Sequence, residues 1–166
     1  MQPAATASKF PRLDGLCVLV VDDMPDVRAT ILVMLRTLGA RGIGAGSAAA
    51  ALQALERERP DVLIADISMP DEDGYSLIRK IRALPPERGG EVAAAAFTAA
   101  DADADLAALL AAGFDFHLAK PVSMEFLMRA IATLALLRPR RPAPPQPFGI
   151  SSATAHLCSS ERRLAG

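Results

Sequence analysis

Aromatic residues and cysteines are scarce in this chain of 166 residues, which has no tryptophan, one tyrosine, six phenylalanines and two cysteines. Two cysteines far apart are too few for a disulfide framework or a metal cluster, and Cys17, inside an apolar run, is expected to pack in the core. No apolar run approaches the ~18–20 residues of a membrane span, and the N-terminus lacks the apolar stretch of a secretory signal. The sequence therefore predicts a cytoplasmic protein with no membrane partner and a small aliphatic core.

The composition is that of a globular protein. Hydrophobic residues make up 51% of the chain and charged residues 22%, which excludes a wholly disordered chain. The length fits one domain of ordinary size with some additional chain. Residues 138–166 are rich in proline and arginine and show no apolar period, so we predict an extended or disordered tail there. Residues 1–13 form a short N-terminal arm, which leaves residues 14–137 as the domain.

The net charge of −1 hides a division along the chain. Residues 14–137 contain 18 acidic and 11 basic residues, whereas the tail holds five arginines and one glutamate. Because an acidic body is a poor match for a phosphate backbone, we predict no nucleic-acid partner. The basic tail is expected to be a solvated extension, and contact with an acidic partner is the alternative.

Short apolar runs rich in β-formers alternate with helical patterns up to residue 137. Buried strands are predicted at 16–21 and 61–66, weaker strands at 41–45 and 91–97, and a fifth strand at 114–119. Helical spacing and capping residues predict helices over about 25–38, 47–59, 75–83, 101–113 and 123–137. This alternation predicts an α/β fold of the (βα)5 kind, with a parallel sheet covered by helices on both faces.

Polar side chains stand where the predicted strands end. The first strand runs into Asp22 and Asp23, the third ends in Asp66, the fourth is followed by Thr98, and the fifth runs into Lys120. In open parallel sheets this edge is where ligands bind. Three carboxylates held close together repel one another unless a cation lies among them, and a hard oxygen site with room for water suits Mg²⁺. Mg²⁺ with a hydroxyl and an ammonium beside it is suited to phosphoryl transfer onto a carboxylate.

Four segments, VLVVDD, DVLIADISMPDEDGY, FTA and AKP, in this order and at these spacings, resemble the receiver domain of two-component response regulators. The resemblance covers about residues 16–137. It implies a doubly wound, flavodoxin-like (βα)5 sheet, all parallel, with strand order 2-1-3-4-5. It also implies a phosphoacceptor that promotes its own phosphoryl transfer and dephosphorylation, and not an enzyme acting on other molecules.

Individual roles follow from the resemblance, position by position. Asp66 matches the phosphoacceptor, and Thr98 and Lys120 match the catalytic pair that holds the phosphoryl oxygens. His117 stands where the family often has tyrosine or phenylalanine, the side chain that turns inward when Thr98 moves. Pro121 matches the proline that follows a cis peptide bond.

The resemblance also implies a Mg²⁺ site. Asp23 and Asp66 match its direct ligands, together with the backbone carbonyl of Ser68, and Asp22 matches the acid that helps to hold the metal through water. Taken singly, such acids have ordinary explanations as helix caps or turn residues. A phosphatase of the haloacid dehalogenase type also uses a strand-end aspartate, but the second acid that it needs two residues later is Ser68 here.

The implied partners are a sensor histidine kinase or a histidine phosphotransfer protein as donor, and a downstream protein that reads a phosphorylation-dependent conformational switch. With no output domain in the sequence, we favour a stand-alone receiver. The receiver portion of a hybrid sensor histidine kinase is the alternative, because the chain most resembles receivers of that kind. A protein-binding scaffold that works without phosphorylation is a third interpretation, against which the intact acids argue. The sequence leaves the oligomeric state open.

Overall fold

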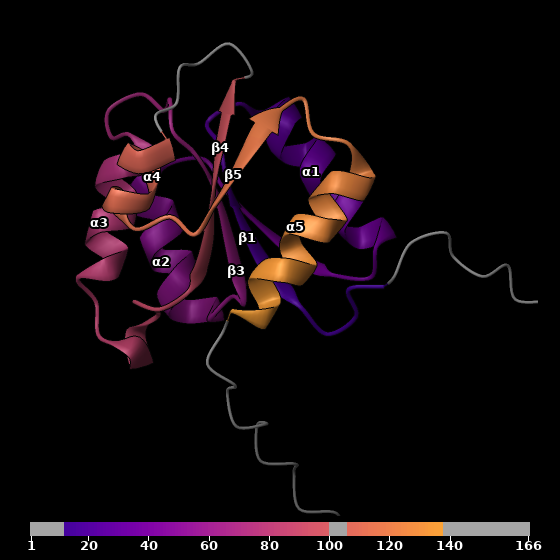
Figure 1. The fold of residues 1–166 in the computed structure, drawn as a ribbon, viewed down its shortest axis with the longest axis horizontal. Coiled ribbons are helices and arrows are strands. Elements are labelled where there is room, and N and C mark those ends of the chain that lie inside the picture. Colours follow the sequence, from indigo (N-terminus) through magenta and orange to yellow (C-terminus); the bar gives the residue numbers. More distant parts are fainter. Residues whose placement is uncertain (1–11, 100–105, 138–166) are drawn as a thin grey trace, which may run out of the picture.

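Strands and helices alternate along residues 12–99 and 106–137, which are the residues that the computed structural model describes. The strands are β1 (Cys17–Val21), β2 (Arg41–Ala45), β3 (Val62–Asp66), β4 (Ala93–Ala99) and β5 (Phe116–Lys120). The helices are α1 (Pro25–Thr37), α2 (Ala48–Glu58), α3 (Gly74–Arg82), α4 (Leu106–Ala112) and α5 (Met124–Leu136), with a short 3-10 turn, η1, at Pro86–Arg88. Figure 1 shows the sheet between two layers of helices.

All the strands of this sheet are parallel, in the order β2-β1-β3-β4-β5. The predicted (βα)5 architecture and strand order are therefore confirmed. From β1 the chain crosses first to β2 on one side and then to β3 on the other, so the order reverses between β1 and β3. In sheets of this kind the reversal opens a crevice at the carboxyl ends of those two strands.

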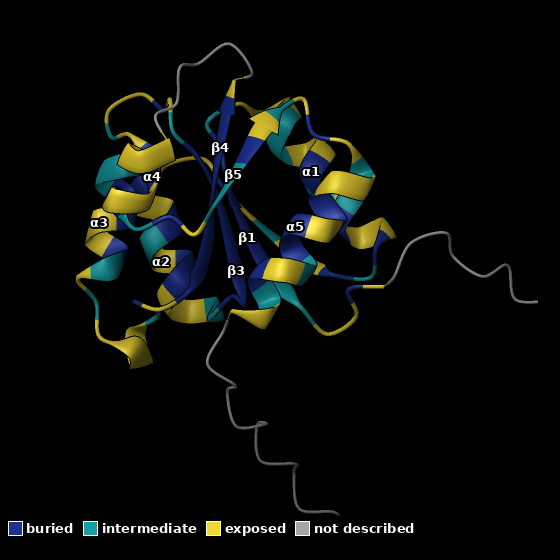
Figure 2. Cartoon of the chain, in the orientation of Figure 1, coloured by how far each residue is buried: buried dark blue, intermediate teal, exposed yellow. Residues whose placement is uncertain are grey.

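Apolar side chains form two cores, one on each face of the sheet. Val18, Val20 and Ile64 point toward α1 and α5, whereas Leu19 and Leu63 point toward α2, α3 and α4. This division follows from the alternation of side chains along a strand. The central strands are buried on both faces (Figure 2), which explains why β1 and β3 read as continuous apolar runs.

Side-chain caps fix the start of three helices. Ser47 accepts a hydrogen bond from the backbone N–H of Ala50, and Ser123 accepts one from Phe126, as their positions in the sequence predict. Asp73 caps α3 in the same way, so α3 begins one residue before the predicted start at Tyr75. The predicted cap of α4, at residue 101, lies outside the described residues.

Two details differ from the sequence-based expectations. β4 extends to Ala99, so Thr98 lies within the strand and not after it, because pairing with β5 continues to Lys120.

Cys17 is only half-buried at the start of β1, with its sulfur 3.9 Å from a guanidinium nitrogen of Arg41, so the prediction that it packs in the core is wrong. Burial raises the pKa of the Cys17 thiol, although the charge of Arg41 opposes this.

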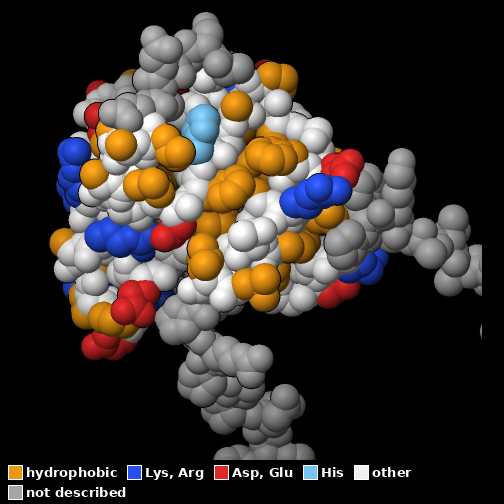
Figure 3. All heavy atoms as spheres, in the orientation of Figure 1, with side chains coloured by type: hydrophobic (Ala, Val, Ile, Leu, Met, Phe, Trp, Pro, Cys, Tyr) orange, Lys and Arg blue, Asp and Glu red, His pale blue; other side chains and the backbone are white. Residues whose placement is uncertain are grey.

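Several apolar side chains remain on the surface over α4 and α5. Leu106 and Leu110 on α4, and Phe126 on α5, are each about half exposed. Figure 3 shows hydrophobic side chains gathered on this side of the molecule. None of the helices in the described part of the chain is both long and apolar enough to cross a membrane.

Candidate functional site

Three carboxylates meet at the carboxyl edge of β1 and β3. Oxygens of Asp22, Asp23 and Asp66 all lie within 4.8 Å of one another. Asp66 is the last residue of β3 and Asp22 directly follows β1, and the register that pairs Val21 with Ala65 brings the two acids side by side. Asp22 is fully buried and Asp66 is almost so, whereas Asp23 is partly exposed. The sequence-predicted acids therefore form one cluster.

Lys120 reaches this cluster from the end of β5. Its ammonium nitrogen lies 2.8 Å from an oxygen of Asp22 and 3.1 Å from an oxygen of Asp66. To reach them, the side chain passes over the ring of Phe97 on β4, 4.8 Å from the ring centre, where a cation is attracted to the ring face. Burial lowers the pKa of Lys120, but hydrogen bonds and charges from the two aspartates outweigh it, so the pKa is raised above its ordinary value of 10.5.

Backbone groups hold the other oxygens of the two buried carboxylates. The N–H of Met24 donates to Asp22 at 2.9 Å, and the N–H of Ser68 donates to Asp66 at 3.1 Å. From α1, a guanidinium nitrogen of Arg28 donates to the carbonyl oxygen of Asp22 at 2.5 Å. The loops after β1 and β3 are thereby fixed around the acids, and each buried carboxylate presents its remaining oxygen to Lys120.

The loop after β3 returns close to the end of that strand. A Cβ atom at Gly74 would lie 2.4 Å from the carbonyl oxygen of Asp66, so only glycine fits this approach without displacing the backbone. The N–H of Gly74 donates to the carbonyl of Ile67, which closes the loop. Asp71, within this loop, has a φ of 67°, in the left-handed region that aspartate tolerates better than most residues. This geometry explains the glycine in the DEDGY motif.

Thr98 and His117 lie together, on the neighbouring strands β4 and β5. The hydroxyl oxygen of Thr98 is 2.6 Å from Nε2 of His117. Strand alternation places Thr98 on the face of the sheet that packs against α3 and α4, whereas Phe97, beneath the Lys120 ammonium, points toward α1 and α5. The structure thus brings the predicted acids and Lys120 together and holds Thr98 against His117. Pro121 follows a cis peptide bond.

The donor set at this edge suits a hard divalent cation. Three carboxylates face the ammonium of Lys120, and even with the guanidinium of Arg28 on the Asp22 carbonyl, negative charge is in excess. Among the residues that the structure describes, the carboxylate of Asp23 has no hydrogen-bond or ion-pair partner. Oxygen donors with one side open to water are the ligands that Mg²⁺ prefers. Asp22, Asp23 and Asp66, with the adjoining backbone carbonyl of Ser68, would hold it.

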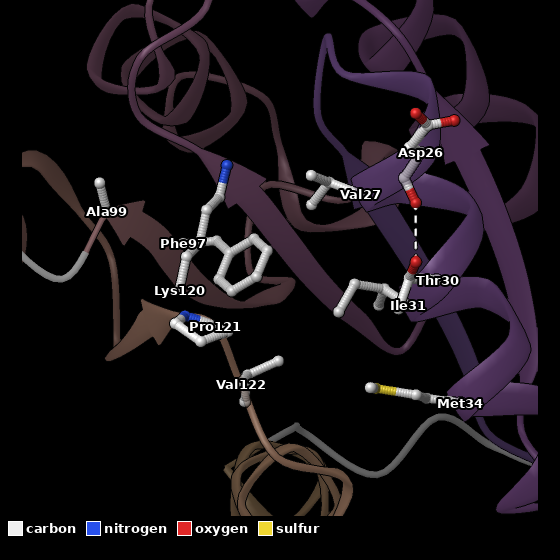
Figure 4. Close-up of a pocket in the computed structure, with 10 residues that line it drawn as sticks. All are labelled: Asp26, Val27, Thr30, Ile31, Met34, Phe97, Ala99, Lys120, Pro121 and Val122. Atoms are coloured by element: carbon white, nitrogen blue, oxygen red, sulfur yellow. Dashed lines mark hydrogen bonds between the residues drawn. The ribbon is translucent and has the colours of Figure 1, made fainter.

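An apolar cavity of about 570 Å³ opens beside Lys120. Figure 4 shows Val27 and Ile31 of α1 on one side of it, with Lys120, Pro121 and Val122 on the other. At its outer edge the hydroxyl of Thr30 donates a hydrogen bond to the backbone carbonyl of Asp26, which satisfies that hydroxyl within the helix. The acidic cluster therefore adjoins a hollow that is lined mainly by hydrophobic side chains.

Comparison with known proteins establishes the family. The chain matches the response regulator receiver domain over residues 18–132, and it belongs to that family. An uncharacterized 14.6 kDa protein from the sodA1 3′ region of Leptolyngbya boryana is 41% identical over 122 residues, which cover 74% of this chain and 92% of that protein. The virulence sensor protein BvgS of Bordetella pertussis is 37% identical over 154 residues, which cover 91% of this chain but 12% of BvgS.

Solved structures agree with this assignment. The receiver domain of the sensor histidine kinase PA1611 from Pseudomonas aeruginosa is 36% identical with a TM-score of 0.66, covering 73% of this chain and 98% of that one, and it holds a magnesium ion in its active site cleft. A receiver domain of a histidine kinase from Syntrophus aciditrophicus is 25% identical with a TM-score of 0.67, covering 80% and 99%. The chain is thus a receiver domain of two-component signalling, similar to the receivers of hybrid kinases.

Proposed function

We propose that this chain accepts a phosphoryl group from a phosphohistidine of a partner protein onto the carboxylate of Asp66, with Mg²⁺ bound, and that it signals through the resulting change of conformation. The observation that supports this most strongly is the double contact of Lys120, whose ammonium bonds both Asp66 and Asp22, the two buried members of a cluster of three acids. A cation fixed beside one carboxylate is placed where charge develops during phosphoryl transfer.

In the proposed reaction a carboxylate oxygen of Asp66 attacks the phosphorus atom. A phosphorus–oxygen bond forms as the phosphorus–nitrogen bond to the donor histidine breaks, and the departing imidazole nitrogen keeps the electron pair and takes a proton from water. Lys120, 3.1 Å from Asp66, neutralises charge on the phosphoryl oxygens. Mg²⁺, when bound by the acids and the Ser68 carbonyl, supplies further neutralisation of those oxygens. Hydrolysis of the aspartyl phosphate by water returns the chain to its starting state.

The donor is a sensor histidine kinase or a histidine phosphotransfer protein. A partner must bring its phosphohistidine to the edge of the sheet where Asp66 lies, and the apolar cavity between α1 and Val122 adjoins that edge. Met24, at the same edge, is 54% exposed and adds apolar surface. Such a surface suits the side chains of a partner helix that flank the phosphohistidine.

A small phosphoramidate tests this function, because its phosphorus–nitrogen bond imitates that of phosphohistidine. With Mg²⁺ the wild-type chain should gain one phosphoryl group by intact-protein mass spectrometry, and chelation of Mg²⁺ should prevent this. Asp66→Asn should abolish labelling. Asp71→Asn, in the loop after β3 but outside the acidic cluster, is the matched control and should label like the wild type. Equal labelling of the Asp66→Asn variant would contradict the assignment.

A second candidate is a relay within a longer phosphotransfer chain. The similarity to BvgS, which extends over 91% of this chain, favours it. In that role the phosphoryl group on Asp66 passes on to a histidine of a phosphotransfer protein. Incubation of the phosphorylated chain with such proteins distinguishes the two roles, since a relay loses its label to the partner, whereas a stand-alone receiver loses it to water.

A further inference from the structure

The aromatic ring of Phe97 lies beneath the ammonium group of Lys120. The ammonium nitrogen is 4.8 Å from the ring centre, within the range in which the face of an aromatic ring attracts a cation. Figure 4 shows the ring beside the Lys120 side chain, at the cavity that both residues line. The register of β3 and β4 pairs Phe97 with Asp66, so the ring, the ammonium and the candidate phosphoacceptor lie next to one another.

The ring of Phe97 is fixed in this place. Phe97 is 2% exposed and packs in the core between the sheet, α1 and α5, and its carbonyl accepts a hydrogen bond from the N–H of Ile67. The other residues of β4 are alanines and one threonine, so Phe97 is the one large side chain of this strand. An aliphatic side chain such as leucine would also fill this part of the core, but it would present no ring face to a cation.

Lys120 therefore has two kinds of partner, which differ in what else they do in the proposed reaction. The carboxylates of Asp22 and Asp66 are also candidate ligands of Mg²⁺, and Asp66 is the candidate phosphoacceptor, so other groups share their negative charge when the site is loaded. The ring of Phe97 has no such second role, because Mg²⁺ prefers oxygen ligands. Its attraction for the ammonium does not depend on whether the acids are engaged.

We propose that Phe97 is a positioning residue for Lys120, because its ring face holds the ammonium beside Asp66, where the ammonium meets the phosphoryl oxygens. This inference rests on the proposed function and adds a residue to it. A weaker attraction to the ring should let the ammonium spread over other positions, so phosphoryl transfer should be slower although the acids and Lys120 are all present. A role in core packing alone predicts that only the size and shape of the side chain at position 97 matter.

Ring fluorination separates these two roles, because fluorine withdraws electron density from the ring face and changes the shape of the ring little. In the full chain, Phe97 is replaced by phenylalanine with one, two or three ring fluorines, and labelling by phosphoramidate at saturating Mg²⁺ is followed by intact-protein mass spectrometry. The maximal labelling rate should fall stepwise, by about two- to tenfold with three fluorines, the scale of one contact between a cation and a ring. The same series at Phe114, which is equally buried on the opposite face of the sheet, is the matched control and should leave the rate unchanged.

A second measurement needs neither metal nor phosphodonor. In urea unfolding without Mg²⁺, three fluorines on Phe97 should lower the folding equilibrium constant about two- to tenfold more in the chain with Lys120 than in the Lys120→Met variant. The labelling series retains Lys120, so it does not depend on the stability of that variant. An equal effect in both backgrounds, or a labelling rate that stays constant along the series, would overturn the role of Phe97 and leave the proposed function standing. Absence of labelling in the wild-type chain would overturn the proposed function, and this role with it.

Discussion

The ammonium nitrogen of Lys120 lies 2.8 Å from a carboxylate oxygen of Asp22, although 98 residues separate the two along the chain. Asp22 is fully buried and the Lys120 side chain is 20% exposed, so this ion pair is largely shielded from water. The same ammonium bonds Asp66. Lys120 therefore places one positive charge beside two buried carboxylates, and under the proposed function it is also the group that meets a phosphoryl oxygen.

Lys120→Met should destabilise the protein by ~3 kcal/mol in the free energy of unfolding, because it leaves two buried carboxylates without their counter-charge. Added Mg²⁺ should restore more stability to this variant than to the wild type, since the ion supplies the missing positive charge. Urea unfolding with and without Mg²⁺ measures both effects. Lys80→Met is the control, because Lys80 is 57% exposed and its pair with Glu72 contributes less than ~1 kcal/mol. Equal losses in the two variants would contradict this account.

The raised pKa of Lys120 predicts a pH dependence of stability. A lysine whose pKa is higher in the folded chain contributes stability that is fully present below its ordinary pKa of 10.5 and is lost as the pH rises through the folded value. The difference in free energy of unfolding between the wild type and Lys120→Met should therefore be constant near neutral pH and shrink in strongly basic solution. A difference that stays constant through that range would show that the ion pair does not raise the pKa.

Arg28 should affect Mg²⁺ binding although it is not a candidate ligand. Its guanidinium holds the carbonyl of Asp22, and its side-chain carbons approach the position where a Cβ on Gly44 would stand, which fixes α1 against the edge of the sheet. Arg28→Met should weaken Mg²⁺ affinity about tenfold, the scale on which groups that orient metal ligands act. Arg36→Met, on an exposed position of the same helix, is the control. Equal Mg²⁺ affinity in the two variants, measured by calorimetry, would count against this role.

Arg82 should be among the most important residues for stability outside the site. From the end of α3 it donates to the carbonyls of Gly90, Val92 and Gly113 at 2.7–2.9 Å and pairs with Asp115. Burial lowers its pKa, against the charge of Asp115. Arg82→Met leaves these carbonyls unpaired and should cost ~3 kcal/mol or more.

The exposed Arg79, on the same helix, provides the matched control for Arg82. Arg79→Met should change the free energy of unfolding by less than ~0.5 kcal/mol in the same urea titration. Losses of similar size in the two variants would contradict the role assigned to Arg82.

The cap of α3 predicts a second pH effect, at acidic pH. Hydrogen bonding from the backbone N–H of Ser76 lowers the pKa of Asp73 below its ordinary value of 3.8. The stability that this carboxylate contributes is therefore present above pH 3.8 and is lost as the pH falls through the lower folded value. Asp73→Ala should cost ~1 kcal/mol at neutral pH.

The Asp73→Ser variant separates the stability contributed by the capping hydrogen bond from that contributed by the carboxylate charge. Serine should retain most of the capping stability at neutral pH, because its hydroxyl also accepts from the helix N–H groups. The serine variant should lack the acidic loss that the wild type shows in urea unfolding below about pH 4. If the wild type and the serine variant lose the same amount of stability at acidic pH, the loss comes from other carboxylates and not from Asp73.

The fold and the acidic cluster could be predicted from the sequence because both depend on local order along the chain. Apolar runs that end in polar residues fix where each strand stops, and a parallel sheet then brings those ends to one edge. β4 was the weakest case, since its alanines have little preference for strands. It forms because pairing with β3 and β5 and burial on both faces outweigh that low propensity.

Contacts between distant side chains could not be predicted in the same way. The family resemblance singles out Thr98 and His117 separately, but only the register between β4 and β5 shows that they share a hydrogen bond. In the sequence, Arg82 is one of several basic residues at the end of a predicted helix. Basic residues are common at that position and are usually exposed to solvent there. Its burial depends on the two segments that meet there, one before β4 and one before β5, and no local sequence pattern indicates this contact.

Chemical mapping of the phosphorylated residue is the most direct test of the central claim. After incubation with phosphoramidate and Mg²⁺, borohydride reduces an aspartyl phosphate to the corresponding alcohol, which peptide mass spectrometry locates in the sequence. The account predicts reduction at Asp66 in the wild type and none in the Asp66→Asn variant. Reduction at Asp22 or Asp23 with Asp66 unmodified, or a labelled chain with no reduced aspartate, would contradict it.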